Sequence, residues 1–319
     1  MRITKVLVPV DFSPPSTVAV NHAVQLARRF RAKLTLLHVI EPGTALMYAF
    51  PTESEIGEKQ RYERAERMLA AMLGPEDQDD LDLETAVVIG DIGMEIAAAV
   101  HEQHADIVVM GTHGRGLVGR WLIGSVTQSL LRKINVPILT VCHATRPLSF
   151  KRILFATDFS EASAGGLEFI MDLAATLNAG VVVAHVVDKR PMVAYETPEV
   201  AAVFDAEQKR FTEEARSTFN QIESEARSRK VKIETILAEG IPADAISRIA
   251  DENTVDFIVL AVSRKSRMDR ILLGTTAEKV IRDANVPVLS VPVRPAAERS
   301  EHEVDEVSHA GTQTHSARP

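Results

Sequence analysis

Short runs of Val, Ile and Leu alternate with amphipathic stretches along most of the chain. Near-continuous apolar runs of this length are typical of strands buried on both faces, whereas apolar residues three and four positions apart indicate helices. The runs in the first half predict strands over residues 3–10, 33–40, 83–89, 106–111 and 136–141. The amphipathic stretches between them predict helices over residues 14–31, 55–73, 94–104 and 125–133.

The chain carries this pattern twice. Val8–Ser13 recurs as Phe155–Ser160 at an offset of 147 residues, and Asn135–Leu139 recurs as Asn285–Leu289 at an offset of 150 residues. The second half therefore predicts strands near residues 151–157, 180–187, 232–238, 255–261 and 287–291. Its helices are expected near residues 161–177, 199–228, 242–252 and 275–283. A repeat of this length indicates a duplicated domain and not a solenoid of short units.

Parallel sheets follow from this order, because strands that alternate with helices are joined by right-handed crossovers. We therefore predict an α/β protein made of two tandem doubly wound, Rossmann-like domains, each with a parallel five-stranded sheet and helices on both faces. The first domain is expected over residues 1–147 and the second over residues 148–294. Residues 295–319 are largely polar without a period, and we predict a disordered tail there.

Composition excludes several classes of protein. The 319 residues carry 36 Lys and Arg against 44 Asp and Glu, a net charge of −8, which argues against wholesale binding to nucleic acid or an anionic membrane. A single cysteine, Cys142, excludes an intrachain disulfide and fits a reducing compartment. No apolar run approaches the roughly 20 residues that span a bilayer, and no signal-peptide pattern precedes the first strand. We therefore expect a soluble cytoplasmic protein.

The strongest chemical signal follows the fourth predicted strand. Gly111, two further residues, Gly114, nine further residues and Gly124-Ser125 form a spaced motif that ends at Thr127. Glycines let a ligand approach the backbone, and the free N–H groups and positive dipole end of the following helix suit phosphate. The hydroxyls of Ser125 and Thr127 can donate to phosphate oxygens or reach a metal ion. The alternative is a glycine-rich loop that caps a helix and binds nothing.

This motif and the opening Val8–Asp11 segment resemble those of the universal stress protein family, and the likeness covers about residues 2–294. The resemblance implies a tandem, two-domain stress-response protein that binds ATP accompanied by Mg²⁺. The resemblance implies Pro9, Val10 and Asp11 at the adenine and ribose end and Val39 at the adenine, with Met110 and Gly111 flanking the ribose and the triphosphate. Those implied to hold the phosphates are Gly114, Gly124, Ser125, Val126 and Thr127.

Asp11 has two readings that do not exclude each other. A carboxylate at the end of the first strand can accept hydrogen bonds from ribose hydroxyls, as acidic residues do in other doubly wound folds. The Asp11-Phe-Ser-Pro14 segment is also typical of a helix entry, so Asp11 can cap the helix that follows.

The second half departs from the motif. At the matching positions it has Ala261, Arg264 and Gly274-Thr275, so the spacing survives while the first two glycines are lost. We expect Ala261 to narrow the ribose region and Arg264 to obstruct the approach of phosphate. The four cations of residues 264–270 either grip an anion or form a solvated loop. We therefore predict one good nucleotide site per chain, in the first half.

Three functions compete. The first is a nucleotide-dependent sensor or signalling module, the second a weak ATPase or nucleotide- or phosphate-transfer enzyme, and the third an interaction scaffold that needs no nucleotide. No Walker lysine accompanies the glycine motif, because Gly124-Ser125 lies between Ile123 and Val126, and no motif places a general base. We therefore assign no catalytic residue. Slow hydrolysis stays open, and efficient turnover is not expected.

Other features have structural interpretations. His38 and His185 end apolar strands at matching positions and are interpreted as structural histidines. His101 and His104 are three residues apart on one helix but have no third ligand near in sequence, so we predict no metal site. The aromatic segment 42–56 is interpreted as a loop that either closes over the nucleotide or packs against the other half.

The resemblance also implies how the halves meet. Single domains of the family pair through their last strands, which here are residues 136–141 and 286–291. Such pairing within one chain leaves no long exposed sheet edge at that point. Whether two chains associate further, and which protein partner is bound, the sequence leaves open.

Overall fold

The computed structural model describes residues 2–42, 51–112, 123–141, 148–188, 198–265 and 270–293, without the side chains of residues 51–56, 78–79, 198–206, 264–265 and 270–272. The predicted tail, residues 295–319, and Cys142 lie outside the described residues. Met47, Tyr48 and Phe50 of the 42–56 segment also lie outside them.

The first half is a doubly wound unit, with strand order β3-β2-β1-β4-β5 and every pairing parallel. Its elements are β1 (Lys5–Pro9), α1 (Pro14–Phe30), β2 (Lys33–Ile40), α2 (Pro51–Ala70), α3 (Pro75–Asp80), β3 (Leu83–Ile89), α4 (Ile92–Glu102), β4 (Ile107–Gly111), α5 (Ser125–Lys133) and β5 (Ile138–Val141). The predicted fold class is confirmed.

The second half repeats the arrangement, with strand order β8-β7-β6-β9-β11 and a short β10 that pairs antiparallel with β9. Its elements are β6 (Arg152–Thr157), α6 (Glu161–Leu177), β7 (Gly180–Asp188), α7 (Pro198–Ser228), β8 (Lys232–Gly240), α8 (Pro242–Glu252), β9 (Phe257–Lys265), β10 (Arg270–Leu272), α9 (Thr275–Asp283) and β11 (Val288–Val293).

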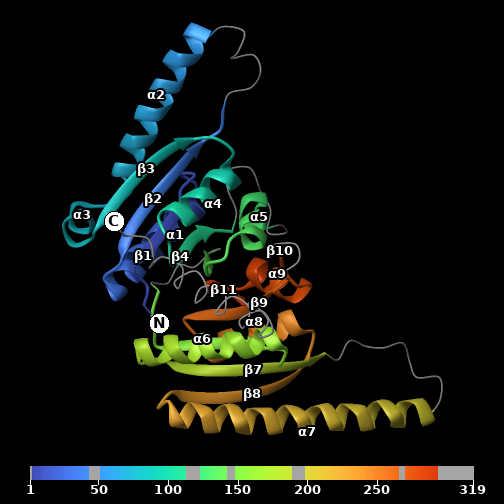
Figure 1. Ribbon diagram of the computed structural model, residues 1–319. Helices are drawn as coiled ribbons and strands as arrows, with labels where there is room; N and C mark the ends of the chain where they lie inside the picture. Colours follow the sequence, from blue (N-terminus) through green and yellow to red (C-terminus); the bar gives the residue numbers. More distant parts are fainter. Residues whose placement is uncertain are drawn as a thin grey trace, which may run out of the picture.

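The two sheets join into one. β5 pairs antiparallel with β11, so Leu139 lies opposite Leu289, its own counterpart in the repeat. The predicted contact of the last strands is therefore confirmed. Figure 1 shows the first half above and the second half below this junction, which we call the β5–β11 seam. The two halves are related by an approximate twofold axis at the seam.

Equivalent helices begin and end alike. α1 is capped by Ser13, whose side chain accepts a hydrogen bond from Ser16 N, and it ends at Arg31 with φ of 53°. α6 is capped by Ser160 and ends at Asn178 with φ of 55°. The serine side chains at the N-caps, and the backbone N–H groups of the left-handed residues at the C-caps, satisfy backbone groups that a helix leaves unpaired. The duplication thus extends to the backbone conformation of the caps.

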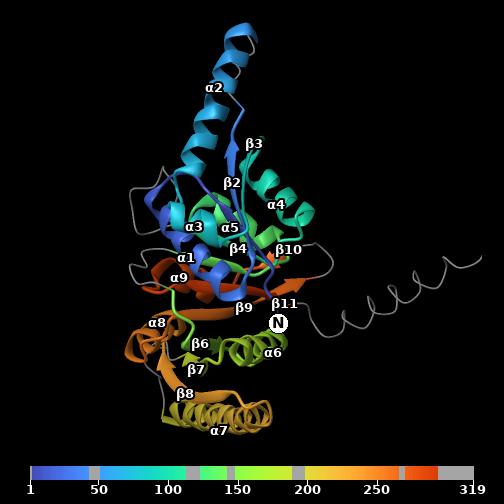
Figure 2. The ribbon, with the colours of Figure 1, turned by 90° about the vertical axis from the view of Figure 1, so that its left-hand side faces the viewer.

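Helices cover both faces of the continuous sheet. One apolar cluster takes in α1, α2, α6 and α7, and the other takes in α4, α5, α8 and α9. Each cluster contains residues from both halves, so the core runs across the seam. Figure 2 shows α2 and α7 at opposite ends of the molecule, where each packs on the outer strands of its own half.

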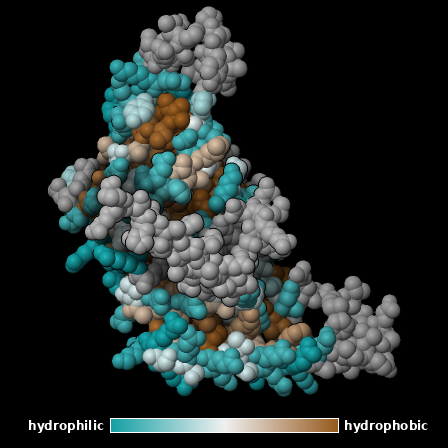
Figure 3. All heavy atoms as spheres, viewed as in Figure 1, coloured by the Kyte–Doolittle hydropathy of each residue, from teal (hydrophilic) through white to brown (hydrophobic). Residues whose placement is uncertain are grey.

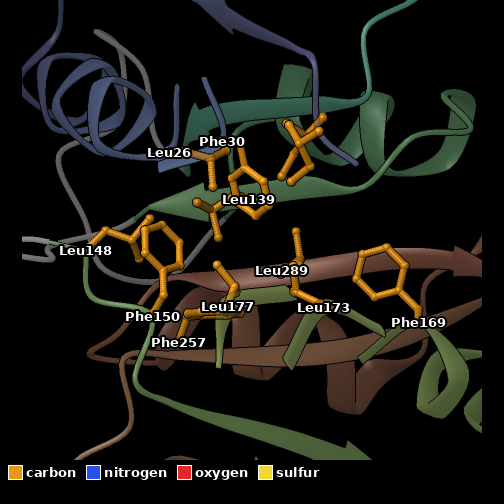
Figure 4. A pocket seen from close by; sticks show the side chains of 12 residues that line it. Leu26, Phe30, Leu139, Leu148, Phe150, Phe169, Leu173, Leu177, Phe257 and Leu289 are labelled. Carbon is orange, nitrogen blue, oxygen red and sulfur yellow. The ribbon is translucent and has the colours of Figure 1, made fainter. Parts of the chain in front are cut away.

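A small apolar cavity of about 20 Å³ lies where the halves meet. Figure 4 shows side chains from α1, α6, β5 and β11 converging on it. Arg132 of α5 also forms an ion pair of 3.0 Å with Glu278 of α9, and Arg29 donates to the Leu177 carbonyl at 3.2 Å. The seam is thus an apolar interface with a few polar contacts beside it.

Some expected boundaries were wrong. Helix α2 begins at Pro51, so the last residues of the predicted 42–56 loop are helical. The predicted basic loop 264–270 is partly a hairpin, because β9 continues to Lys265 and β10 begins at Arg270, with the two strands in antiparallel register. Sequence periodicity also missed α3, whose residues are mostly acidic and polar.

The long helix α7 covers the core, as its amphipathic pattern predicted. Ala215, Phe219, Ile222 and Ala226 are buried, and Figure 3 shows largely hydrophilic residues on the face of α7 that is seen there. Phe211, on the same helix, is 48% exposed. Among the described residues, no helix is both long and apolar enough to cross a membrane.

His22 predicts a dependence of stability on pH. It is buried in α1, with Nδ1 2.9 Å from the Val18 carbonyl and Nε2 without a hydrogen-bond partner among the described residues. Burial lowers the pKa of His22, and the hydrogen bond to Val18 offsets only part of this effect. The unfolded chain therefore binds a proton that the native imidazole does not. We expect the free energy of unfolding to fall as the pH drops below about 6.5 and toward the lowered native pKa.

Urea unfolding at several pH values between about 5 and 8 measures this effect. His22→Phe, which copies Phe169 at the matching position of α6, should flatten the dependence. His101→Gln, at an exposed position of α4, serves as the control and should retain it. An unchanged pH dependence in the His22→Phe protein would show that other groups cause it.

Candidate functional site

A cavity of about 740 Å³ lies at the carboxyl ends of the first-half strands. The chain runs outward from β1 through β2 to β3 on one side, and from β4 to β5 on the other. The strand order therefore reverses between β1 and β4, and doubly wound folds bind their ligands at such a switch point. The cavity is lined from the ends of β1, β2 and β4 and from α2, α4 and α5.

Most of the predicted site residues line this cavity. The ten that do so are Pro9, Val10, Asp11, Val39, Met110, Gly111, Gly124, Ser125, Val126 and Thr127. Gly114, His113, Arg115 and Arg120 lie outside the described residues. Lining residues that sequence reasoning did not single out as ligand-binding are Phe12, Ser16, Leu37, His38, Ile40, Glu41, Arg61, Arg64, Ala65, Met68, Ile92 and Ile96.

Asp11 organises the turn that leaves β1. Its Oδ1 accepts hydrogen bonds from Ser13 N at 2.9 Å and from Ser13 Oγ at 2.6 Å. Ser13 in turn caps α1, so the expectation that Asp11 itself caps the helix is wrong and Asp11 positions the capping residue. Phe12 between them has φ of 60°, a conformation that costs energy for a residue with a side chain and is found at ligand sites.

Asp158 forms the same turn in the second half. Its Oδ1 accepts from Ser160 N at 2.9 Å and from Ser163 Oγ at 2.6 Å, and Phe159 has φ of 58°. Burial alone raises the pKa of Asp158, but hydrogen bonds from Ser160 and Ser163 outweigh it, so the pKa lies below its ordinary value. The carboxylate at this turn is thus held ionised by its own loop.

His38 and His185 make matching hydrogen bonds. His38 Nδ1 lies 2.6 Å from the Val10 carbonyl, and His185 Nδ1 lies 2.8 Å from the Thr157 carbonyl. Each ring therefore joins two neighbouring strands at their carboxyl ends, which agrees with the structural interpretation. His38 also lines the cavity, so it shapes the wall while it holds the strands together.

The N-terminus of α5 opens onto the cavity. Gly124 is its N-cap, no side chain caps the helix there, and Ser125 at the first position is exposed. Thr127 was expected to offer its hydroxyl to phosphate. Its side chain is 3% exposed, and Oγ1 donates to the Gly111 carbonyl at 3.0 Å. The hydroxyl thus ties α5 to the end of β4, and the backbone N–H groups of the first turn face the cavity as donors.

Gly111 has a packing reason that the motif did not reveal. A Cβ at residue 111 would lie 2.9 Å from Pro15 Cβ and 3.0 Å from the Pro15 carbonyl carbon. In the second half the matching Ala261 has its methyl against Gly166 of α6, where a Cβ would come within 2.6 Å of it. The methyl of Ala261 thus packs against α6, and the expectation that it narrows the ribose region stays a prediction.

Helix α2 brings cations to the cavity. Arg61 and Arg64 line it, and their counterparts in α7 follow from the offset of 150 residues, which matches buried Ala65 with buried Ala215. Arg61 then corresponds to Phe211, and Arg64 corresponds to Glu214. From the sequence, α2 was interpreted only as an amphipathic helix. The two arginines could have been found from their positions beside its apolar residues.

No group of three or more residues able to hold a metal occurs among the described part of the chain. His101 lies on α4, but His104 lies beyond the end of this helix, so the expectation of both on one helix is wrong; the centroids of their rings are 6.4 Å apart. The cavity walls therefore offer backbone N–H groups, hydroxyls, guanidinium groups and two carboxylates. Such walls suit an anionic organic ligand better than a metal cage.

The fold and the cavity define a tandem doubly wound α/β protein with a cavity at the switch point of its first half. The model of the universal stress protein family matches residues 2–141 and again residues 149–292, and the chain belongs to this family.

Individual relatives match one half at a time. The universal stress protein MJ0531 of Methanocaldococcus jannaschii is 32% identical over 142 residues, 44% of this chain and 82% of its own. MJ0577 of the same organism is 31% identical over 153 residues, 44% of this chain and 94% of its own. The crystal structure of a universal stress protein from Archaeoglobus fulgidus covers 92% of this chain and 99% of its own, with a TM-score of 0.62. At 20% identity, that likeness concerns the fold.

Proposed function

We propose that the first half binds ATP with Mg²⁺ and that the chain is a nucleotide-dependent sensor or signalling module of the stress response. One observation carries this proposal: ten residues that the family resemblance implied line one cavity at the switch point. Its volume of about 740 Å³ falls within the range of small-molecule sites. We assign the nucleotide-binding domain to residues 1–147, its degenerate partner to residues 148–294 and the tail to residues 295–319, in a cytoplasmic protein.

Different parts of the cavity wall suit the base, the ribose and the phosphates of ATP. Val39, Ile92 and Val126 supply apolar surface for the base. The carboxylate of Asp11 would accept hydrogen bonds from the ribose hydroxyls. The open first turn of α5 would bind phosphate through its N–H groups and dipole. Bound Mg²⁺ keeps phosphate and water oxygens as most of its ligands, so it needs no cage of protein carboxylates.

The charge at the cavity favours one site per chain. The charged positions of the first-half cavity are Asp11, Glu41, Arg61 and Arg64, with no net charge. The matching positions of the second half are Asp158, Asp188, Phe211 and Glu214, with a net charge of −3. The two arginines that line the first-half cavity thus have no counterpart at these positions, and the first two glycines of the motif are lost as well.

Calorimetric titration of the nucleotide-free protein with ATP and Mg²⁺ tests the proposal, and we expect one site per chain. Ser125→Glu places a carboxylate at the first position of α5, where it favours the helix but repels phosphate. We expect it to weaken ATP binding at least about tenfold, the equivalent of 1.4 kcal/mol, without lowering the melting temperature. Thr275→Glu makes the same change at the matching position of α9 and should leave ATP binding unchanged.

Three results would count against a single ATP site in the first half. Equal weakening by Ser125→Glu and Thr275→Glu, or two bound ATP per chain, would show that the second half binds nucleotide as well. The absence of ATP binding to the wild-type protein would favour a scaffold that needs no nucleotide.

A further inference from the structure

We propose that Arg61 and Arg64 of α2 form a second anion subsite in the cavity, which takes a phosphate carried on the ribose of the nucleotide. The inference rests on the proposed function, because it concerns the same cavity. The ligand would then be an adenosine that carries phosphate both at the 5′ position and on the 2′ or 3′ hydroxyl of the ribose, and not a nucleotide phosphorylated at the 5′ position alone.

The cavity extends across the carboxyl ends of the strands, from one face of the sheet to the other. Helix α2 packs with α1 on one face, whereas α5 packs with α4 on the other face. The two arginines therefore approach the ligand from the side opposite the N-terminus of α5. Asp11, at the end of β1 between the two faces, lines the same cavity. A ligand that places its 5′ phosphates at α5 and its ribose at Asp11 leaves the arginines for another group.

Arg61 has hydrogen-bond donors that lack an acceptor among the described residues. Its Nε and Nη2 are buried and have no hydrogen-bond partner among the described residues, although 41% of the side chain is exposed. The Glu58 carboxylate lies 3.9 Å from Nη2, which is beyond hydrogen-bond distance. Buried charged donors without an acceptor are costly, so an acceptor on the ligand would bind here with advantage.

The second half supplies an internal comparison. Phe211 and Glu214 replace the two arginines there, so one cation becomes an aromatic residue and the other an anion. The same half has Ala261 in place of Gly111 and Arg264 in place of Gly114. The arginines thus occur in the half that keeps the glycine motif and are absent from the half that lost it, which agrees with a shared ligand.

The chemistry of the two groups indicates the ligand. In doubly wound folds an acidic residue takes the ribose hydroxyls, and a nearby arginine accommodates a phosphate on the ribose. Guanidinium groups bind phosphate oxygens through paired N–H donors. Glu41 lines the same cavity and offsets part of the charge of the two arginines.

Calorimetric titrations with AMP, adenosine 2′,5′-bisphosphate, adenosine 3′,5′-bisphosphate and ATP test this subsite on the full chain. We expect one of the bisphosphates to bind the wild-type protein at least about tenfold more tightly than AMP. In the Arg61→Ala/Arg64→Ala protein this ratio should fall to near one. Arg67→Ala removes an equal charge from an exposed position of α2 outside the cavity, and it should keep the wild-type ratio.

Three results would overturn the proposal. The first is a wild-type protein that binds both bisphosphates no more tightly than AMP. The second is a double variant that keeps the preference. The third is a double variant in which only the ratio of ATP to AMP affinity falls, since the arginines would then contact the 5′ phosphate chain. ATP binding by the wild-type protein separates these results from failure of the proposed function, because ATP then binds while the ribose-phosphate preference is absent.

Discussion

Leu289→Ala is expected to lower the free energy of unfolding by about 2–5 kcal/mol. Leu289 of β11 is 3% exposed and lies opposite Leu139 of β5 at the seam. Both side chains already border the apolar cavity of about 20 Å³, so the lost methyl groups enlarge a void that is not filled. Apolar side chains from both halves line this void, and the loss is therefore shared by the two halves.

The two halves should unfold together because the core runs across the seam. Trp121 is the single tryptophan of the chain, so its fluorescence reports on the first half, whereas circular dichroism reports on both. We expect Leu289→Ala, a change in the second half, to lower both transition midpoints equally. Leu289→Met conserves side-chain volume and should cost less than about 1.5 kcal/mol. A fluorescence transition that stays in place while the dichroism shifts would show independent halves.

Much of the fold follows from local signals. Leu83–Ile89 and Ser125–Lys133 were predicted with the bounds that β3 and α5 have, since apolar periodicity and the Gly-Ser helix start define them. The hairpin that joins β9 to β10 was not predicted, because Arg264 and Arg270 conceal its strand character. Tertiary pairing with β9, which no local pattern reports, determines β10.

Some residues of the candidate site could be predicted from the sequence, and others could not. The family resemblance, carried by the glycine motif and the Val8–Asp11 segment, implied the residues at the ends of β1, β2 and β4 that line the cavity. Arg61 and Arg64 required knowledge of which face of α2 docks over the cavity. The residue types of Thr127 and Gly111 fit phosphate chemistry, but the contacts of these residues are structural. Thr127 joins α5 to β4, and Gly111 packs closely against α1.

Gly166→Ala is expected to destabilise the protein by about 1–3 kcal/mol, although alanine favours a helix more than glycine does. A Cβ at residue 166 would lie 2.6 Å from Ala261 Cβ and 3.1 Å from Phe155 Cε2. Real Cβ atoms essentially never approach so closely, and Ala261 cannot yield without a shift of β9. At the matching positions the first half has Ala19 in α1 and Gly111 in β4.

The reciprocal arrangement makes this a double-mutant test. Ala261→Gly alone should cost about 1 kcal/mol, through the lost methyl contact and the flexibility of glycine in a strand. Gly166→Ala/Ala261→Gly reproduces the pairing of the first half, so we expect it to be at least about 1 kcal/mol more stable than the sum of the single changes predicts. Additive losses in urea unfolding would contradict the packing argument. Recovery would show that helix packing, rather than loss of ligand, permits alanine at residue 261.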